Sequence, residues 1–351
     1  MYATWPLSLL LSNPEAVLWP PPDGGNSGYL VVKDIDDDSD DEQVWCTGGV
    51  RSRSLVENLP FPQNRVFRVG YDDGDGENKA KDTVLFVPVL DQPLASNRYY
   101  PVIASGRRKG LVRACSREED MTPGCFGMSV NDVEPRPFDP ADIYQQIEIV
   151  QRRRGQFTAK AVAPDGIPYK LYGSKYWRAY ASRPKNLYLG EARGINATLR
   201  SRQLTTPRAV VGRWYCPFYL VKEDGLSPAE QLDRAAFYEV TLEQRWEPIR
   251  DDAVSSRVLI GGSIEARQDV SSSSYGNGYV WFISPATWQR VGVSTAMWER
   301  MRWEEYMGGW VDEETGWVPG RSVLVERFAV KRRDGSVAMA FDFAHINKIT
   351  P

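Results

Sequence analysis

The most strongly patterned stretch of the chain, residues 210–246, combines two kinds of hydrophobic spacing. Its first part reads VVGRWYCPFYLV and is rich in aromatic and β-branched residues, as buried strands are. Its second part predicts a helix over 228–246, because Ser227 is a favourable N-cap, Pro228 takes the first helical position and Glu230 completes a capping box. We therefore expect a long strand followed by a well-capped helix at the centre of the fold.

Shorter alternating or continuous apolar runs predict further strands, and a second helical pattern follows at 293–307 and ends at a pair of glycines. The fold class we expect is α+β, mainly antiparallel β-sheet with at least two packed helices at about 228–246 and 293–307. The other expected strands lie at 29–32, 65–71, 83–90, 97–104, 157–163, 257–264, 278–284, 323–330 and 337–343.

Three prolines within residues 133–140 mark the best candidate for a linker. They predict a β-rich N-terminal part over 1–138 and an α+β C-terminal part over 139–351, either as two parts or as one interlocked unit.

Composition narrows the range of functions. The formal charge of −3 argues against general binding to nucleic acid, which needs a basic protein surface. The four cysteines form no CxxC pair, which favours reduced, mostly buried thiols and a cytoplasmic or nuclear protein. No run of 18 apolar residues is present, so we expect no transmembrane segment.

Several familiar chemistries lack their residues. The chain has one histidine, His345, so a site with a pair of histidine ligands cannot form. There is no GxxxxGK[ST] loop, no GxGxxG after a strand and no GxSxG elbow. Acidic segments at 34–42 and 72–77 could hold a cation, but solvated loops are the favoured interpretation. We expect neither a metal nor a cofactor.

Two groups of side chains remain as speculative ligand-binding residues. Glu239 and Glu243 lie one turn apart on the apolar face of the predicted helix, where they could act as an acid/base pair or be ion-paired, with Arg300 as an available cation; the ion pair is the favoured interpretation. Tyr176 and Trp177, interleaved with basic residues, could stack a ligand, although core packing with cation–π contacts is favoured.

Long sequence blocks carry a family resemblance, which extends from the first residue to about Phe343. The chain resembles a plant-specific domain-of-unknown-function family, number twelve-sixty-two. The family has no established enzymatic activity and no assigned catalytic residues that the resemblance could transfer to this chain, and its members are associated with stress and defence responses. The blocks include MYATWPLSLL, VLFVPVLDQPLASNRYY, DIYQQIEIV, FYEVTLEQRWE and ERMRWEEYMGGWV.

These observations lead to one main functional interpretation and two alternatives. The main one is a soluble, non-enzymatic protein of the cytoplasm or nucleus that binds a partner or small ligand in defence or stress. A toxin-like, pore-forming or insecticidal defence protein would instead act on a foreign membrane through a long amphipathic hairpin around 257–284. A carboxylate-based hydrolase, the third interpretation, requires Glu239 and Glu243 to line an open pocket.

Overall fold

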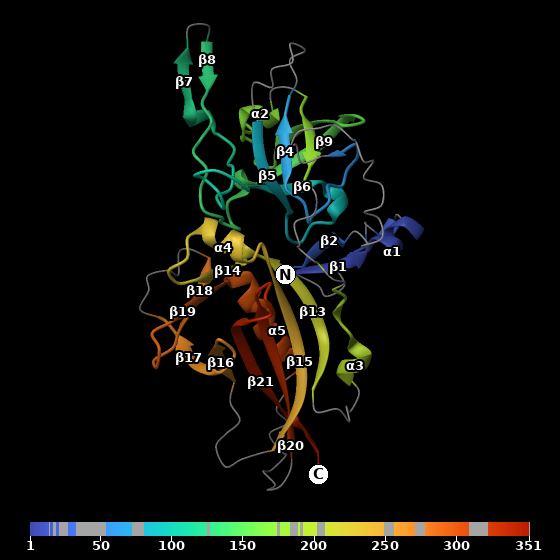
Figure 1. The fold of residues 1–351 in the computed structure, drawn as a ribbon, viewed down its shortest axis with the longest axis vertical. Coiled ribbons are helices and arrows are strands. Elements are labelled where there is room, and N and C mark those ends of the chain that lie inside the picture. The colour runs from blue at the N-terminus through green and yellow to red at the C-terminus, as the bar shows by residue number, and fades with distance from the viewer. Residues whose placement is uncertain are drawn as a thin grey trace, which may run out of the picture.

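The computed structural model shows an elongated molecule with a β-sheet at each end and the N-terminus near the middle (Figure 1). Two sheets and one separate hairpin make up most of the described chain. The structure describes residues 1–13, 15–16, 19–20, 27–32, 54–71, 81–124, 127–173, 176–182, 189, 192–201, 208–248, 256–270, 278–308 and 322–350.

The smaller sheet has seven strands among the described residues, all antiparallel, in the order β10-β9-β6-β5-β4-β11-β3. Its core is a cluster of rings that includes Phe61, Phe86, Phe157 and Trp177. The strands are β3 (Ser54–Leu55), β4 (Phe67–Gly70), β5 (Lys81–Pro88), β6 (Arg98–Ile103), β9 (Ile147–Arg153), β10 (Gln156–Ala161) and β11 (Arg178–Ala181), with the short helix α2 (Lys170–Gly173) beside them.

The larger sheet has 12 strands in the described chain, and its long central strands β21, β20, β15 and β13 are antiparallel neighbours. Only β1 and β2 pair in parallel. The strands are β1 (Tyr2–Pro6), β2 (Gly28–Val32), β12 (Gly194–Ile195), β13 (Ala209–Pro217), β14 (Val221–Glu223), β15 (Phe237–Pro248), β16 (Arg257–Ile260), β17 (Ile264–Gln268), β18 (Tyr279–Ile283), β19 (Arg290–Ser294), β20 (Ser322–Lys331) and β21 (Val337–Thr350).

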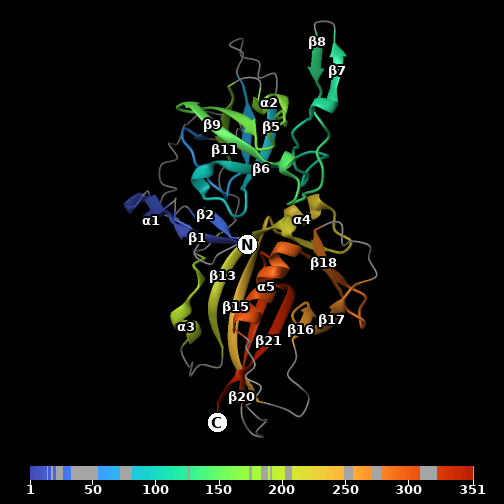
Figure 2. The ribbon, with the colours of Figure 1, turned by 180° about the vertical axis from the view of Figure 1, so that it is seen from behind.

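Four further helices and one hairpin accompany the larger sheet and its junction with the smaller one. Helix α5 lies against the face that carries β21, and α4 lies where the two sheets meet (Figures 1 and 2). The hairpin of β7 (Met121–Gly124) and β8 (Gly127–Val130) projects away from the body in both views. The helices are α1 (Leu7–Ser12), α3 (Ala197–Ser201), α4 (Pro228–Arg234) and α5 (Thr295–Gly308).

The prediction of a helix over 228–246 is wrong beyond its first two turns. The capping box of Ser227 and Glu230 forms as expected, but α4 ends at Arg234 and the chain continues as β15. This strand lies between β13 and β20 and is buried on both faces over 240–244. Pairing with two neighbours satisfies its backbone groups and buries its aromatic and β-branched side chains, which outweighs the local helical pattern.

The structure confirms the second predicted helix and the shorter predicted strands. Helix α5 confirms the predicted helix at 293–307 with a start two residues later, and all nine of the shorter predicted strands have a counterpart. The chain is mostly antiparallel β-sheet, as expected.

The two sheets exchange segments of the chain. Strands β9 to β11 follow the Pro-rich stretch at 133–140 but join the smaller sheet, while β1 and β2 precede it and join the larger one. Rings from both sides pack together at the junction: Phe138 stacks on Tyr219 with centroids 3.6 Å apart and meets Tyr100 edge-on at 4.9 Å. The expected division into 1–138 and 139–351, as two parts or as one interlocked unit, stays a prediction.

The turn at 106–110 shows how tightly the two parts meet at α4. Gly110 has φ +85°, and a Cβ there would lie 2.5 Å from the Pro228 backbone. Lys109 pairs with Asp233 of α4, so the turn contacts α4 through an ion pair as well as through its backbone. At Gly106, with φ +78°, a Cβ would meet nothing within 4 Å.

We expect Gly110→Ala to destabilise the protein more than Gly106→Ala. Both substitutions carry the left-handed backbone penalty of about 1–2 kcal/mol, but only Gly110→Ala also collides with a backbone that cannot yield, at a further cost of about 1–3 kcal/mol. Urea unfolding of the two variants measures the difference. Equal losses of stability would contradict a close contact between this turn and α4.

Candidate functional site

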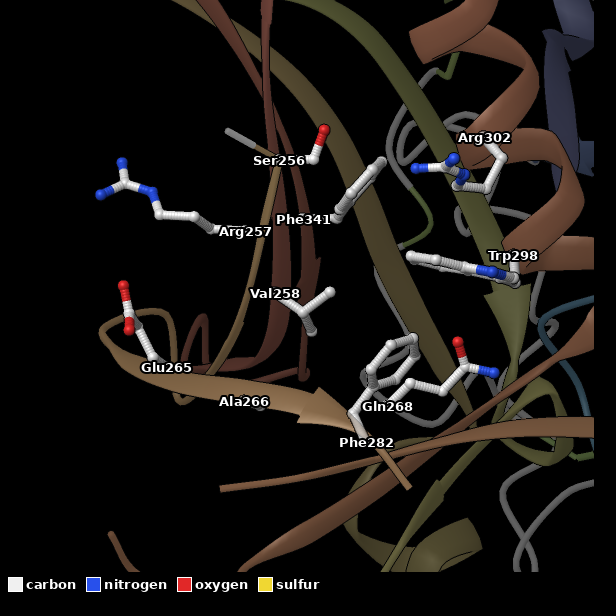
Figure 3. Close-up of a pocket in the computed structure, with 10 residues that line it drawn as sticks. All are labelled: Ser256, Arg257, Val258, Glu265, Ala266, Gln268, Phe282, Trp298, Arg302 and Phe341. Atoms are coloured by element: carbon white, nitrogen blue, oxygen red, sulfur yellow. The ribbon is translucent and has the colours of Figure 1, made fainter. Parts of the chain in front are cut away.

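A pocket of about 400 Å³ lies between α5 and the strands β16, β17, β18 and β21 (Figure 3). Its volume is within the range of small-molecule sites, which is about 300–1,000 Å³. Five of its ten lining residues are apolar and five are polar or charged. The lining residues are Ser256, Arg257, Val258, Glu265, Ala266, Gln268, Phe282, Trp298, Arg302 and Phe341.

Three aromatic rings form the apolar wall of the pocket. The ring of Trp298, on α5, lies 4.9 Å from that of Phe282, on β18, and 4.9 Å from that of Phe341, on β21, in tilted and edge-on arrangements. Phe282 and Phe341 are almost fully buried, whereas Trp298 is only partly covered. Because its neighbours hold it from two sides, the indole is a pre-positioned surface for a flat ligand.

Charged groups lie at two ends of this wall. Figure 3 shows Arg302 beside Trp298 at one end and Arg257 with Glu265 at the other. The Arg302 guanidinium pairs with Glu305 and lies 6.0 Å from the Trp298 ring. The Arg257 guanidinium lies 3.7 Å from the carboxylate of Asp342. The end with Arg302 can therefore accept an anionic group next to an aromatic platform.

Behind α5, away from this pocket, lies a group of buried charges that we call the buried ion cluster. It consists of Arg200 on α3, Arg300 and Glu304 on α5, Glu326 on β20 and His345 on β21, with the neutral Gln244 of β15. The side chains of Glu304, Glu326 and His345 are fully buried, and Arg300 is 5% exposed.

Arg200 links the two carboxylates of this cluster. Its guanidinium donates to Glu326 through Nε at 3.1 Å and Nη2 at 2.7 Å, and to Glu304 through Nη1 at 2.5 Å. Arg300 donates to Glu304 from one turn earlier on α5 at 2.7 Å. His345 Nε2 lies 2.9 Å from Glu326. Two guanidinium groups thus balance two fully buried carboxylates, and the Arg200 side chain itself is 17% exposed.

The two carboxylates of the cluster differ in acidity. Burial raises the pKa of Glu326, but hydrogen bonds and charges from His345 and Arg200 outweigh it and lower that pKa to about 2. Burial dominates for Glu304 and raises its pKa against the opposing charges of Arg200 and Arg300, with a further contribution from the charge of Glu326. On acidification, Glu304 therefore accepts a proton before Glu326 does.

Glu239 and Glu243 lie on strand β15 rather than on a helix, and each has a cationic partner. Glu243 is buried and pairs with Lys331 at 2.8 Å and with Arg208, while Glu239 lies 3.7 Å from Arg213. Burial raises the pKa of Glu243, but hydrogen bonds from Lys331 and Arg208 outweigh it and hold the pKa below its usual value. Neither glutamate lines the pocket, so the geometry required by the hydrolase interpretation is not found there.

The other three predicted site residues are not brought together either. Arg300 pairs with Glu304 and also lies over the ring of Trp303, 4.7 Å from its centroid. Trp177 is fully buried in the core of the smaller sheet, whereas its neighbour Tyr176 is 59% exposed. The packing of Trp177 agrees with the favoured interpretation, and ligand binding by these residues stays a prediction.

Other candidate chemistry is limited in the part of the chain that the structure describes. No group of three metal-ligating side chains is found there. The acidic segments 34–42 and 72–77, which were considered as cation loops, lie outside the described residues. Cys115 and Cys216 are buried free thiols, and burial raises the pKa of each to about 12. At neutral pH both thiols are therefore protonated and unreactive.

The pocket was not predicted from the sequence. The walls of the pocket come from β16–β18, α5 and β21, and no local motif connects these elements. The one available signal was the apolar side of the predicted second helix, which comprised Val293, Ala296, Met297, Arg300, Trp303, Glu304 and Met307. Met297, Arg300 and Glu304 are buried, as that pattern predicts, but Trp303 and Met307 are 48% and 55% exposed. Trp298 and Arg302, which line the pocket, lie outside the pattern.

Comparison with known proteins adds a partial family match. A family model described as "Protein of unknown function (DUF1262)" matches residues 23–126, which confirms the domain of unknown function over that part of the chain. No curated protein matches the chain. Among solved structures, the crystal structure of Cry35Ab1 is similar at a TM-score of 0.42 and 10% identity, covering 83% of this chain and 90% of that one.

Two observations concern membranes. Among the helices that the structure describes, none is long and apolar enough to cross a membrane. Over 257–284, the region expected to form a long amphipathic hairpin, the described residues form the three short strands β16, β17 and β18. Strands β17 and β18 pair at only two positions, and β17 has no buried residue. The membrane-acting interpretation stays a prediction.

Proposed function

We propose that this protein binds a small molecule that carries a flat apolar ring and an acidic group, in the pocket between α5 and β16–β18 and β21. The observation that carries the proposal is the meeting of three rings with the Arg302 guanidinium in a hollow of about 400 Å³. Pockets that combine an apolar wall with a few convergent polar groups are typical of ligand sites.

The chemistry of each end explains why the ligand should be both aromatic and acidic. A flat ring can lie against the partly covered Trp298, which the buried Phe282 and Phe341 hold in place, and exclude water from its indole. Arg302 can then form a bidentate contact with a carboxylate or sulfonate. Its present partner, Glu305, is 19% exposed and Arg302 is 53% exposed, and a partly exposed ion pair of this kind contributes only about 0–1 kcal/mol, so an incoming anion can replace Glu305.

Binding of naphthalene-2-sulfonate, compared with neutral 2-naphthylmethanol, tests the proposal by calorimetry. We expect Arg302→Gln to weaken sulfonate binding about 10- to 100-fold, as loss of a hydrogen bond to a charged group does, and to change binding of the alcohol little. Trp298→Leu should weaken both ligands, because it removes the shared ring platform.

Arg333→Gln is the matched control, since Arg333 is exposed in a turn away from the pocket. It should bind both compounds as the unmodified protein does. Equal binding by Arg302→Gln and the unmodified protein, or no binding of either compound by the unmodified protein, would contradict the proposed site.

The same preparation separates the binding interpretation from the toxin-like alternative. A protein whose task is to bind a small ligand should leave the dye inside phosphatidylcholine vesicles, with or without anionic lipid. Dose-dependent dye release would instead favour a protein that acts on membranes.

We extend the proposal to a role in plant defence or stress responses in the cytoplasm or nucleus. It is supported by the sequence resemblance and by the two buried thiols, Cys115 and Cys216, which are reduced. Imaging of a fluorescent fusion in plant cells tests the location. Accumulation in the secretory pathway would contradict it.

A further inference from the structure

We propose that the buried ion cluster positions α5 for the pocket, so that the pocket loses affinity for its ligand when Glu304 becomes neutral. Glu304 is then a positioning residue, and acidification releases the ligand. The inference rests on the proposed function for its ligand-binding test, and a second measurement, made without any ligand, tests it independently.

The pocket and the cluster use two flanks of the same helix. Trp298 and Arg302 are one turn apart on α5, and so are Arg300 and Glu304. At 100° per residue, the two pairs lie about 160° apart around the helix axis. The fully buried Met297 lies between them and packs into the core of the larger sheet. Any rotation of α5 that moves Glu304 must therefore move Trp298 and Arg302 as well.

The apolar stripe alone is a poor guide to the rotation of this helix. Met297 and Met301 are its most buried apolar residues, and methionine side chains adapt to many packing arrangements. Hydrogen-bonded ions are directional. Glu304 is fixed by Arg200, and Arg200 is fixed in turn by its two bonds to Glu326 on β20. This chain of contacts ties α5 to the sheet at one rotation.

Neutralising Glu304 breaks this chain at the helix. The charged groups that face Glu304 are Arg200 from α3, Arg300 from α5 itself, and Glu326 from β20, with His345 of β21 on the far side of Glu326. Once Glu304 has taken up a proton, Arg200 keeps its charge-assisted bonds to Glu326 on the sheet but loses the ion pair with the Glu304 carboxylate, so that its link to α5 is reduced to a 3.4 Å bond to the Glu304 carbonyl.

Burial raises the pKa of Glu304, whereas the pKa of Glu326 is about 2, so mild acid acts on the helix side of the link and leaves the sheet side intact. Ligand release should therefore begin at a pH above the ordinary pKa of a glutamate side chain, which is about 4.3.

The first test measures binding of naphthalene-2-sulfonate, which stays anionic over the whole range, at about pH 7.5 and about pH 5. We expect the unmodified protein to lose about 5- to 20-fold in affinity at the lower pH, within the usual range of coupling between sites. Glu304→Gln should bind weakly at both pH values. Glu299→Gln, an equal change on the exposed face of α5, should follow the unmodified protein.

The second test follows amide hydrogen exchange over 295–308 without ligand. At about pH 7.5, α5 should exchange faster in Glu304→Gln than in Glu299→Gln, while the strands of the smaller sheet exchange equally in both. If Glu304→Gln does not fold, the unmodified protein at the two pH values, corrected for intrinsic exchange rates, replaces it.

The two tests fail in different ways. If the unmodified protein does not bind the sulfonate at either pH, the proposed function is contradicted and the exchange of α5 decides the positioning role. If the sulfonate binds but its affinity is the same at both pH values and in Glu304→Gln, the positioning role is overturned. Unchanged exchange of α5 overturns it as well.

Discussion

Replacing Arg200 with methionine is expected to lower the free energy of unfolding by about 3–5 kcal/mol, as removal of one partner from a buried ion pair does. Among the described residues, Arg200 alone donates hydrogen bonds to both the Glu304 and the Glu326 carboxylates. Without it, two fully buried carboxylates face each other with less opposing charge. Urea unfolding at neutral pH measures the loss.

A double variant checks whether the unpaired charge of Glu326 causes the loss of stability in Arg200→Met. In Arg200→Met/Glu326→Gln, one of the two carboxylates that lost their cationic partner becomes neutral, so part of the destabilisation should disappear. We expect the double variant to lose less stability than the sum of the two single variants. Simple additivity would show that the two side chains do not interact.

The same ion pair gives stability a pH dependence whose sign follows from the pKa of Glu326. That pKa is about 2 in the folded protein and lower than the ordinary value of 4.5. The contribution of Glu326 is therefore fully present above about pH 4.5 and is lost as the pH falls toward 2. In Arg200→Met this part of the acid slope should be shallower, because Arg200 is one cause of the lowered pKa.

Replacing Trp177 with alanine should cost about 3–5 kcal/mol, the usual range for removing a large buried ring. Trp177 is fully buried, and its ring centroid lies 5.4 Å from that of Phe157, 5.7 Å from Tyr172 and 6.2 Å from Phe86. Its indole N–H donates to the Tyr172 carbonyl at 3.0 Å, so the substitution also removes the shorter of two hydrogen bonds to this buried acceptor, which keeps the 3.4 Å bond from the Thr158 hydroxyl. Thermal and urea unfolding measure the effect.

Tyr176→Ala is a matched control next to this position in the chain. Its side chain is 59% exposed, and we expect a change within about 0.5 kcal/mol. A large loss of stability in Tyr176→Ala, or a small one in Trp177→Ala, would contradict this division between an exposed and a buried ring.

Much of the secondary structure could be predicted because it depends on local chemistry. The capping box of Ser227 and Glu230 needs only neighbours within three residues, and α4 begins where it predicts. The end of α4 could not be predicted in the same way. Glu239 and Glu243 are four residues apart, a spacing that fits one helical turn and two repeats of a strand equally well. Only pairing with β13 and β20 selects the strand.

The candidate site was less accessible to sequence reasoning. Glu239 and Glu243 were correctly expected to favour ion pairs, but Arg300 is not their partner, because the strand places them near Lys331, Arg208 and Arg213. The pocket depends on aromatic rings from three elements, and in the local sequence each ring is indistinguishable from an ordinary core residue. The walls of the pocket have no spacing that a sequence pattern could reveal, and within the ion cluster only Arg300 and Glu304 share a helical spacing.

The sequence by itself determined the strand-rich class, the turns, the start of α4, the extent of α5 and the exclusion of paired-histidine sites. These follow from propensity, capping and the count of residue types, which act within a few positions. Tertiary structure decided that residues 237–248 form a strand rather than a helix. It also decided the interlocking of the two sheets, the partners of each buried charge and the position of the pocket. A buried charge or ring takes whichever partner the folded chain brings within a few ångströms, and that choice is made by the packing of distant segments.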